Sequence, residues 1–366
     1  MYYIIFLIGV VFIFLPKYHK VLAFIFTVFL LILALLRYGV GTDFYAYEYL
    51  YNSFNKTIFY EIGNSKAREE ILFRIISTIG NKFSISYIVS LAFYSFISLV
   101  CIYKAATNYS TNALLSIFTF YSFFYFVWIF SGIRQGIVIS IATLMILLCY
   151  EKNKNKTLIV TIMLLSMIHV SVLVVLVLYF IAKINWSKKL LFYLFIVSFF
   201  ISLLPINIFD YTSILTERVA SYKPNNKIIN LDFQSIVRLC LVTIVFLLYS
   251  KLIKINTTHH FIIKYYILGM CMYFLLKDIE LVAARVSIYS RVLEIFIVPA
   301  ILYITNKKSI YITLLIMIIF LFIYFNKELI NMGQNISSDK QTWYVPYTNI
   351  FNKDNFYFVK ERIFNN

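Results

Sequence analysis

The chain has 366 residues, of which 62% are hydrophobic and only 13% are charged, and its mean hydropathy is +0.84. These values lie far outside the range of soluble domains, so the composition excludes a soluble enzyme or binding module. The formal net charge is +17, but the basic residues lie between apolar runs and form no patch of the kind that binds nucleic acid. We therefore expect a multi-pass membrane protein without a nucleic-acid partner.

Apolar runs long enough to cross a bilayer recur along the chain. The first run lacks a basic leading segment and a small-residue cleavage site, which favours a retained helix over a signal peptide. The predicted fold class is all-α: one integral transmembrane bundle over residues 1–366, with no soluble domain. The ten predicted spans lie near residues 2–15, 21–36, 84–103, 112–130, 133–150, 189–204, 235–250, 262–276, 292–305 and 310–325.

Two further apolar runs, between residues 157 and 182, are short and break at His169. Each covers about 18–20 Å at a rise of about 1.5 Å per residue, less than a hydrocarbon core of about 30 Å. Lysines flank the pair on both sides, and the positive-inside rule places both flanks in the cytoplasm. We predict a re-entrant helix pair with His169 at its tip. One long kinked helix is the alternative.

The same rule gives a map of the whole chain. The lysine-bearing segments 17–20, 151–156, 183–189, 251–254 and 307–308, with Lys104, are expected to face the cytoplasm. The loops 37–83, 206–233 and 277–291 and the tail 326–366 are expected outside. Within the first outer loop, REEILFRIISTI (68–79) places Ile71, Leu72, Ile75 and Ile79 on one face. This pattern predicts an amphipathic helix at the outer interface.

The arginines follow this map closely. All nine fall in outer segments or at outer helix ends: residues 37, 68, 74, 134, 218, 238, 285, 291 and 362. The guanidinium fork suits fixed contacts with phosphate or carboxylate, whereas lysine needs only to supply charge. Salt bridges with nearby acids are the alternative, and we favour it for Arg68, beside Glu69 and Glu70, and for Arg218.

Two candidate site residues lie in or beside membrane runs. Arg134, in SGIRQG, is expected in the first turn of a helix capped by Ser131, where exposed amides and the helix dipole favour an anion. Gln135 lies beside it. His169 is the one histidine inside a membrane run, and ionisable groups there are costly and usually functional.

The stretch RYGVGTDFYAY (37–47) interrupts the apolar pattern with Arg37, two glycines and Asp43. The glycines predict a tight turn that returns Arg37 and Asp43 over a cavity mouth, although the two could simply pair. Tyr45 and Tyr47 begin a tyrosine series that continues at 49 and 51. Tyrosines near a membrane commonly belong to an aromatic belt at its interface. The more specific alternative is that these rings form a wall that faces the sugars of a substrate.

Nearer the end of the chain, Arg285 and Arg291 flank the start of a span. Arg291 could simply form an ion pair with Glu294, one helical turn further on, instead of binding a ligand. Asp278 and Glu280 signal a metal site only weakly. We expect no metal and no other cofactor.

Four of these motifs occur in an order that resembles a known family. RYGVGTDFYAY (37–47), GIRQG (132–136), IHVSV (168–172) and SRVLEIF (290–296) look like the successive motifs of the EpsG-like branch of Wzy-type polysaccharide polymerases. An aromatic pair would be expected after the arginine of the last motif and is missing here. The resemblance extends from about residue 37 to 300.

The resemblance implies a glycosyltransferase on the outer face of the bacterial inner membrane. It would join undecaprenyl-diphosphate-linked oligosaccharide repeat units into O-antigen, capsule or exopolysaccharide. His169 or Asp43 would act as the base, and Arg134, Arg285 and Arg291 would hold the departing diphosphate. Further substrate contacts are assigned to Arg37, Tyr45, Tyr47, Gln135 and Arg238.

The expected partners are the lipid-linked oligosaccharide, membrane lipid, and a chain-length regulator and flippase of the same pathway. Two other functions remain open. A flippase for the same lipid-linked sugar should present charged groups to both faces. A membrane O-acetyltransferase should draw its acyl donor from the cytoplasmic side.

Overall fold

The computed structural model describes residues 1–366 apart from 65–68, 205–232, 278, 307, 331–346 and 353–366. In the described residues the chain is helical, and the single extended pairing is an isolated bridge between Arg37 and Asn349. The α-helices are α1 (Tyr2–Ile13), α2 (His19–Leu36), α3 (Phe44–Ser53), α4 (Ile58–Gly63), α5 (Ile71–Lys82), α6 (Tyr87–Tyr109), α7 (Ala113–Phe123), α8 (Ile133–Glu151), α9 (Asn155–Ser166), α10 (Val174–Lys183), α11 (Lys188–Ile201), α13 (Phe233–Leu252), α14 (Thr257–Leu275), α15 (Glu280–Arg291), α16 (Glu294–Tyr303) and α17 (Ile310–Ile330).

The bundle confirms an all-α fold but not the number of spans. Among the described residues, five helices are long and apolar enough to cross a membrane: α2, α6, α8, α13 and α17. A sixth span results if α15 and α16, which bend by 43°, count as one. The expected span at 112–130 is divided into α7 and a π-helical turn over Phe126–Ser131. The count of ten spans stays a prediction.

Burial along the helices suits a lipid environment. α7 is buried along its entire length and α14 along nearly all of it, so these helices form the centre of the bundle. Helices at the periphery expose large apolar side chains, among them Leu7 of α1, Tyr193 of α11 and Ile316 of α17. An extensive apolar surface is unfavourable in water. The described helices are therefore those of a membrane protein.

The segment around His169 forms a hairpin. α9 ends at Ser166, a 3₁₀ turn follows at Val170–Leu173, and α10 returns beside α9. The Lys183 ammonium at the end of α10 donates to the side chains of Asn153 and Asn155 at the start of α9, each at 3.0 Å. The alternative of a single kinked helix is therefore wrong. Whether the hairpin is re-entrant stays a prediction.

Loops that the sequence map assigns to one side of the membrane contact one another. At one end, Tyr109 donates to Glu151 at 3.0 Å, and Lys183 donates to the side chain of Asn153 at 3.0 Å. At the opposite end, the Leu72 amide of α5 donates to the Met167 carbonyl at the hairpin tip at 2.9 Å. The bundle therefore has the two ends that the map requires. Which end faces the cytoplasm stays a prediction.

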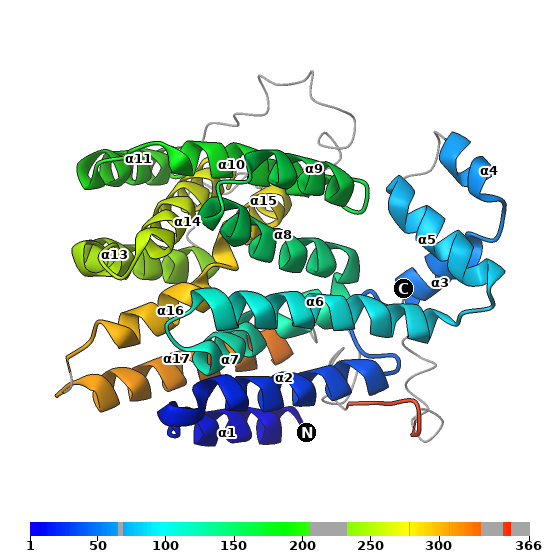
Figure 1. Cartoon of the computed structure of the whole chain (residues 1–366), viewed down its shortest axis with the longest axis horizontal. Coiled ribbons are helices and arrows are strands. Elements are labelled where there is room, and N and C mark those ends of the chain that lie inside the picture. Colours follow the sequence, from blue (N-terminus) through cyan, green and yellow to red (C-terminus); the bar gives the residue numbers. More distant parts are fainter. Residues whose placement is uncertain (65–68, 205–232, 278, 307, 331–346, 353–366) are drawn as a thin grey trace.

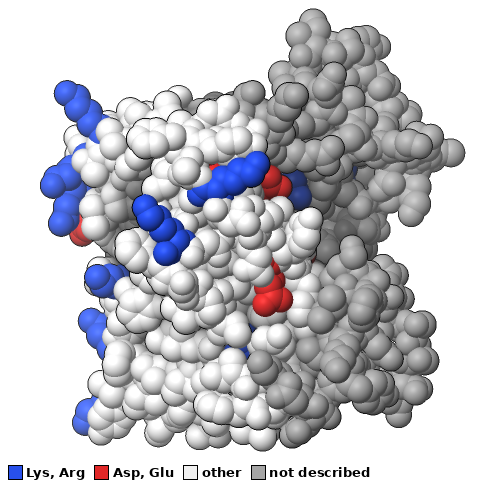
Figure 2. Space-filling model, turned by 90° about the vertical axis from the view of Figure 1, so that its right-hand side faces the viewer, with Lys and Arg blue, Asp and Glu red and all other residues white. Residues whose placement is uncertain are grey.

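The expected outer loop 37–83 folds into α3, α4 and α5, which lie at one end of the bundle (Figure 1). The predicted amphipathic helix is α5. Its buried side includes Phe73, Ser77 and Gly80, whereas Ile79 of the predicted apolar face is exposed. Its location at a membrane interface stays a prediction. Figure 2 looks onto this end, where the described surface is mostly uncharged; basic side chains lie along its left edge and also across its upper middle, near acidic ones.

A short segment of the C-terminal tail is fastened to the end of α2. The Tyr38 amide donates to the Thr348 carbonyl, and the Ile350 amide donates to the Leu36 carbonyl, both at 3.0 Å. The Tyr347 hydroxyl donates to the Leu33 carbonyl at 2.9 Å. The start of the turn at 37–43 is thereby fixed from both sides. The loop 206–233, apart from Phe233 at the start of α13, and most of the tail lie outside the described residues.

Candidate functional site

The predicted glycine turn is present and packs against the π-helical segment. Gly39 and Gly41 have φ values of +64° and +114°, a region that residues with a side chain rarely adopt. A Cβ atom at Gly41 would overlap the carbonyl oxygen of Phe130. The Thr42 amide donates to the Ser131 hydroxyl at 3.1 Å. The first motif of the sequence therefore lies directly against the start of the second.

Ser131 does not cap α8, contrary to the expectation from the sequence. The N-cap residue is Gly132, which has no side chain to accept a hydrogen bond. The hydroxyl of Ser131 receives the Thr42 amide instead. Close packing explains the local sequence, since a Cβ at Gly136 would overlap the Trp128 carbonyl. The small residues of this motif bring α8 against the π-helical segment.

Arg134 occupies the first turn of α8, as predicted, between acidic and aromatic side chains. Its Nη1 lies 2.8 Å from Oε2 of Glu70. Its Cζ lies 4.9 Å from the ring centre of Phe73 and 5.2 Å from that of Tyr47. Both members of the ion pair are partly exposed, with 18% and 21% of their side-chain surfaces accessible. The guanidinium is therefore held in a fixed orientation and remains reachable.

Tyr47 connects the first motif to this arginine. It lies on α3 and shares a hydrogen bond with the Arg134 guanidinium. Burial raises the pKa of the Tyr47 phenol, and the nearby positive charge of Arg134 opposes that shift. The phenol is therefore neutral at physiological pH and accepts a hydrogen bond from the guanidinium.

His169 begins a chain of polar side chains that extends across the bundle. Its Nδ1 lies 2.9 Å from the Ser171 hydroxyl and 3.4 Å from the Ser171 amide. The Ser171 hydroxyl lies 2.9 Å from the hydroxyl of Tyr289 on α15. Tyr289 is in turn hydrogen-bonded to Gln135, which follows Arg134 on α8. The chain therefore links the hairpin tip, α15 and α8.

Arg285 and Glu70 complete this arrangement. Gln135 Nε2 donates to the backbone carbonyl of Arg285 at 3.4 Å. The charges of Glu70, Arg134 and Arg285 all act on the His169 ring. We call the set that these contacts define the His169 group; its members are Tyr47, Glu70, Arg134, Gln135, His169, Ser171, Arg285 and Tyr289.

The tyrosine series does not form one wall. Because 44–53 is an α-helix, its tyrosines point in different directions. Tyr45 and Tyr51 are buried, and the Tyr51 hydroxyl donates to the Ile85 carbonyl at 2.8 Å. Tyr49 is 75% exposed. Of the two predicted sugar contacts, Tyr47 joins the His169 group and Tyr45 packs in the core.

Arg37 does not lie over a cavity mouth. Its side chain is fully buried, with Cζ 4.6 Å from the ring centre of Phe130 and no hydrogen-bond partner for its guanidinium among the described residues. No ion pair joins it to Asp43 in the described part of the chain. Asp43 is half-buried at the N-cap position of α3 and accepts from the Thr42 hydroxyl at 3.0 Å. A substrate contact by Arg37 and a base role for Asp43 stay predictions.

Arg291 and Arg238 lie in a second polar set, because the charges of Arg291 and Glu294 act on Arg238. We call this set the Arg238 group; its members are Gln234, Arg238, Tyr266, Tyr273, Arg291 and Glu294. Nε of Arg291 is 3.9 Å from Oε1 of Glu294, which also accepts from the Tyr266 hydroxyl at 3.2 Å. Arg238 donates to Gln234 at 3.0 Å and lies 3.7 Å above the ring of Tyr273. Glu294 is thus the partner that the sequence offered for Arg291.

The two groups are separate in the described residues. Tyr289 and Arg291 stand two positions apart on α15 and so face different sides of the helix. No hydrogen bond or ion pair in the described part of the chain connects the groups. The catalytic role predicted for Arg291 and the substrate contact predicted for Arg238 remain predictions.

Three members of the His169 group were missed as site residues. Glu70 was assigned with Glu69 to Arg68, which lies outside the described residues, and its observed partner is Arg134. Ser171 was visible in the histidine-x-serine motif but received no role. Tyr289 stands between the two predicted arginines of α15 and lacked a distinguishing signal, because the chain contains 31 tyrosines.

No set of three or more histidine, cysteine, aspartate or glutamate side chains gathers as a metal site among the described residues. Asp278 lies outside them, and so does the side chain of Glu280.

The fold and the His169 group define a helical membrane protein whose first three motifs meet, with α15, at one end of the bundle. The EpsG family model matches residues 20–349, so the chain belongs to the EpsG family. Comparison with curated proteins and with solved structures gives no match.

Proposed function

We propose that this protein polymerises lipid-linked oligosaccharide repeat units into a surface polysaccharide on the outer face of the bacterial inner membrane. Membership of the EpsG family is compatible with such an activity. The observation that carries the proposal is the convergence of Tyr47, Arg134, His169 and Arg285 from distant parts of the chain. These residues combine a base, two cations and an aromatic ring.

His169 is the proposed base. With the imidazole proton on Nδ1, that nitrogen gives up the long 3.4 Å contact in which it accepts the Ser171 amide and donates at 2.9 Å to the Ser171 hydroxyl, which can donate onward to Tyr289. Nε2 then keeps its lone pair free for the sugar hydroxyl of the acceptor. As the hydroxyl oxygen bonds to the anomeric carbon of the donor sugar, its proton passes to Nε2. Of the charges that act on His169, the Glu70 carboxylate favours the imidazolium, whereas the guanidinium groups of Arg134 and Arg285 disfavour it.

Arg134 and Arg285 are the proposed contacts for the leaving group. The bond from the anomeric carbon to undecaprenyl diphosphate breaks with its electron pair on the diphosphate oxygen, so negative charge develops there. The Glu70 carboxylate lies 2.8 Å from the Arg134 guanidinium. A phosphate oxygen in that place would keep the same charge-assisted contact. The ring contacts of Arg134 would hold its guanidinium in position during the exchange.

Deletion of the gene tests this function. Cells without the protein should keep single repeat units on the lipid carrier or the final acceptor, exposed on the outer surface, and should lose the ladder of longer chains on a gel of surface polysaccharide. Accumulation of lipid-linked units on the inner leaflet would instead identify a flippase. A ladder of normal length that lacks acetyl groups would identify an O-acetyltransferase.

A further inference from the structure

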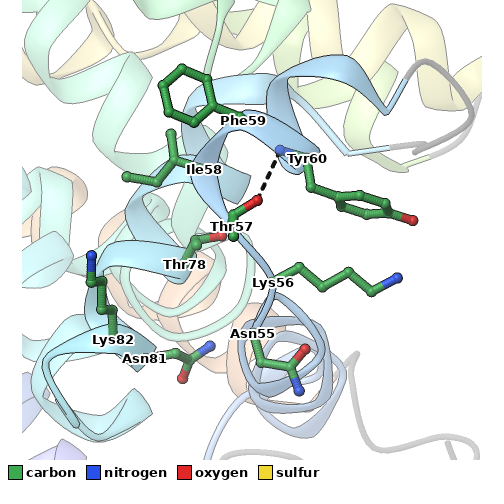
Figure 3. A pocket seen from close by; sticks show the side chains of 9 residues that line it. All are labelled: Asn55, Lys56, Thr57, Ile58, Phe59, Tyr60, Thr78, Asn81 and Lys82. Atoms are coloured by element: carbon green, nitrogen blue, oxygen red, sulfur yellow. Dashed lines mark hydrogen bonds between the residues drawn. The ribbon is translucent and has the colours of Figure 1, made fainter.

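A groove between α4 and α5 lies outside the His169 group. Its volume is about 800 Å³, within the usual range of ligand sites. Figure 3 shows that α4, the segment before it and the second half of α5 supply its walls. The residues that line it are Asn55, Lys56, Thr57, Ile58, Phe59, Tyr60, Thr78, Asn81 and Lys82.

The side chains of this α4–α5 groove suit a sugar. Phe59 and Tyr60 are exposed rings, with Phe59 87% accessible, and an aromatic face packs against the C–H face of a pyranose. The carboxamide of Asn55 has no partner among the described residues and is available to sugar hydroxyls. These features combine apolar packing with the directional hydrogen bonds that a glycan needs.

The charge of the groove selects among glycans. Lys56 and Lys82 extend on opposite sides of it (Figure 3), and the nine lining residues include no acid. The Lys56 ammonium lies 4.1 Å from the ring centre of Tyr60 and keeps that ring beside a positive charge. A negatively charged sugar would therefore meet attraction from both sides and repulsion from neither.

The groove is preformed by its own hydrogen bonds. Asn81 Nδ2 donates to the carbonyls of Tyr51 and Phe54, at 2.7 and 2.9 Å, and so fixes the end of α5 to the end of α3. The Thr57 hydroxyl accepts the Tyr60 amide at 3.3 Å and caps α4. Because these internal hydrogen bonds hold the walls in place, little ordering is required when a ligand binds.

Helix α5 joins the groove to the His169 group. Glu70 stands at its N-cap and contacts Arg134, whereas Lys82 at its last residue lines the groove. Twelve residues of α-helix span about 18 Å. An oligosaccharide whose reacting end lies at His169 would have sugars further along the chain at the level of the groove.

We infer that the α4–α5 groove binds an acidic oligosaccharide, a segment of the substrate several sugars away from the bond that is formed. This inference rests on the proposed function for its choice of ligand. The groove would retain the growing chain or the incoming repeat unit between rounds of transfer, while the His169 group carries out the chemistry.

Titration calorimetry on the purified full-length protein tests the groove. The probe is a set of oligosaccharides without lipid, released from the producing strain's own surface polysaccharide by partial acid hydrolysis. Tyr60→Ala should weaken binding about tenfold, through loss of ring stacking. The double variant Lys56→Gln, Lys82→Gln should weaken it by a similar factor of about ten and remove much of its salt dependence.

Matched controls are available outside the groove. Tyr49→Ala removes an exposed tyrosine from α3, and Lys104→Gln removes an exposed lysine from α6; both should leave binding unchanged.

The outcomes separate this inference from the proposed function. If the probe binds but the groove variants behave like the controls, the groove is not the glycan site, and the polymerase function is unaffected. An unchanged affinity in the lysine double variant alone would exclude the acidic specificity. If the probe does not bind the wild-type protein, the groove has no glycan affinity, and the effect of His169→Gln on chain length decides the function separately.

Discussion

A histidine can act as a base only while one of its ring nitrogens keeps a free lone pair. The Ser171 hydroxyl engages Nδ1 of His169 and is itself held by the Tyr289 hydroxyl. In the proposed mechanism Nε2 is the nitrogen that receives the substrate proton. His169→Gln preserves polarity at a similar size but removes the titratable nitrogen. We expect this variant to abolish chain growth while the amount of protein in the membrane stays normal. A polysaccharide gel and an immunoblot of the membrane fraction measure the two quantities.

Tyr289→Phe is the milder companion experiment. It removes one hydroxyl from the chain and leaves the ring and the base in place. Loss of one hydrogen bond of about 1 kcal/mol should slow polymerisation by about fivefold.

Long chains at the normal rate in His169→Gln cells would show that His169 has a structural role.

Arg134 combines an ion pair with Glu70 and contacts with two aromatic rings. A lysine keeps the charge but loses the planar fork that stacks and binds bidentately. Arg134→Lys should therefore reduce polymerisation by about tenfold or more at an unchanged protein level. The in vitro rate of chain extension measures the loss. Lys104→Gln, at an exposed position of α6, should have no effect. Full activity of Arg134→Lys would show that only the positive charge at position 134 matters, and not the planar geometry of the guanidinium group.

For single residues, the sequence indicated which side chains stand out by their chemistry better than it indicated which other side chains they contact. Arg134, Gln135, His169 and Arg285, which the structure brings together, were singled out because polar groups stand out from an apolar background. Glu70 was paired with its neighbour Arg68, whereas its observed partner is 64 residues away. The Ser171–Tyr289 contact spans 118 residues. Such partnerships depend on how helices pack, which a single sequence does not record.

At the scale of elements, the glycine turn and the break at His169 were predictable because each has a strong local signal. Glycine tolerates positive φ, and an ionisable residue interrupts an apolar run. The π-helical turn at Phe126–Ser131 was not predictable, since FVWIFS reads as part of a continuous span. The tyrosines at 45, 47, 49 and 51 follow the period of two that a strand has, whereas the segment is the helix α3, so their spacing gave no correct signal of the local structure.

Gly41→Ala tests the turn as an element. The substitution introduces a side chain at φ +114° against the Phe130 carbonyl. We expect the protein to lose about 1–3 kcal/mol of stability and, with α3 displaced, part of its activity. Gly63→Ala is the matched control, because a Cβ at Gly63 meets no atom within 4 Å. Thermal unfolding in detergent should show a lower midpoint for Gly41→Ala alone. Equal midpoints for the two variants would mean that the turn does not fix α3.

For the whole molecule, the charge pattern predicted one end with lysine-bearing loops and an opposite end with the arginines. The loops of the structure are distributed between its two ends in this way. The lysine-bearing loop 152–156 meets Lys183, whereas the arginines of the His169 group gather at the opposite end. Span count was the weaker prediction. Hydropathy alone does not distinguish a straight span from short helices joined at a bend, as α15 and α16 are.

The orientation of the two ends is tested by cysteine labelling in intact cells. The four native cysteines include the exposed Cys240, so labelling requires a background in which all four are replaced. Single cysteines are then placed at positions 56, 154 and 225. Because lysine-rich loops stay in the cytoplasm, an impermeant thiol reagent should label positions 56 and 225 but not 154. Permeabilised cells should show labelling at all three positions, which proves that the cysteine at 154 is reactive.

Labelling of position 154 in intact cells would show that the predicted cytoplasmic and outer sides of the membrane are reversed. In that case the His169 group would face the cytoplasm, and polymerisation at the outer face of the membrane would be excluded.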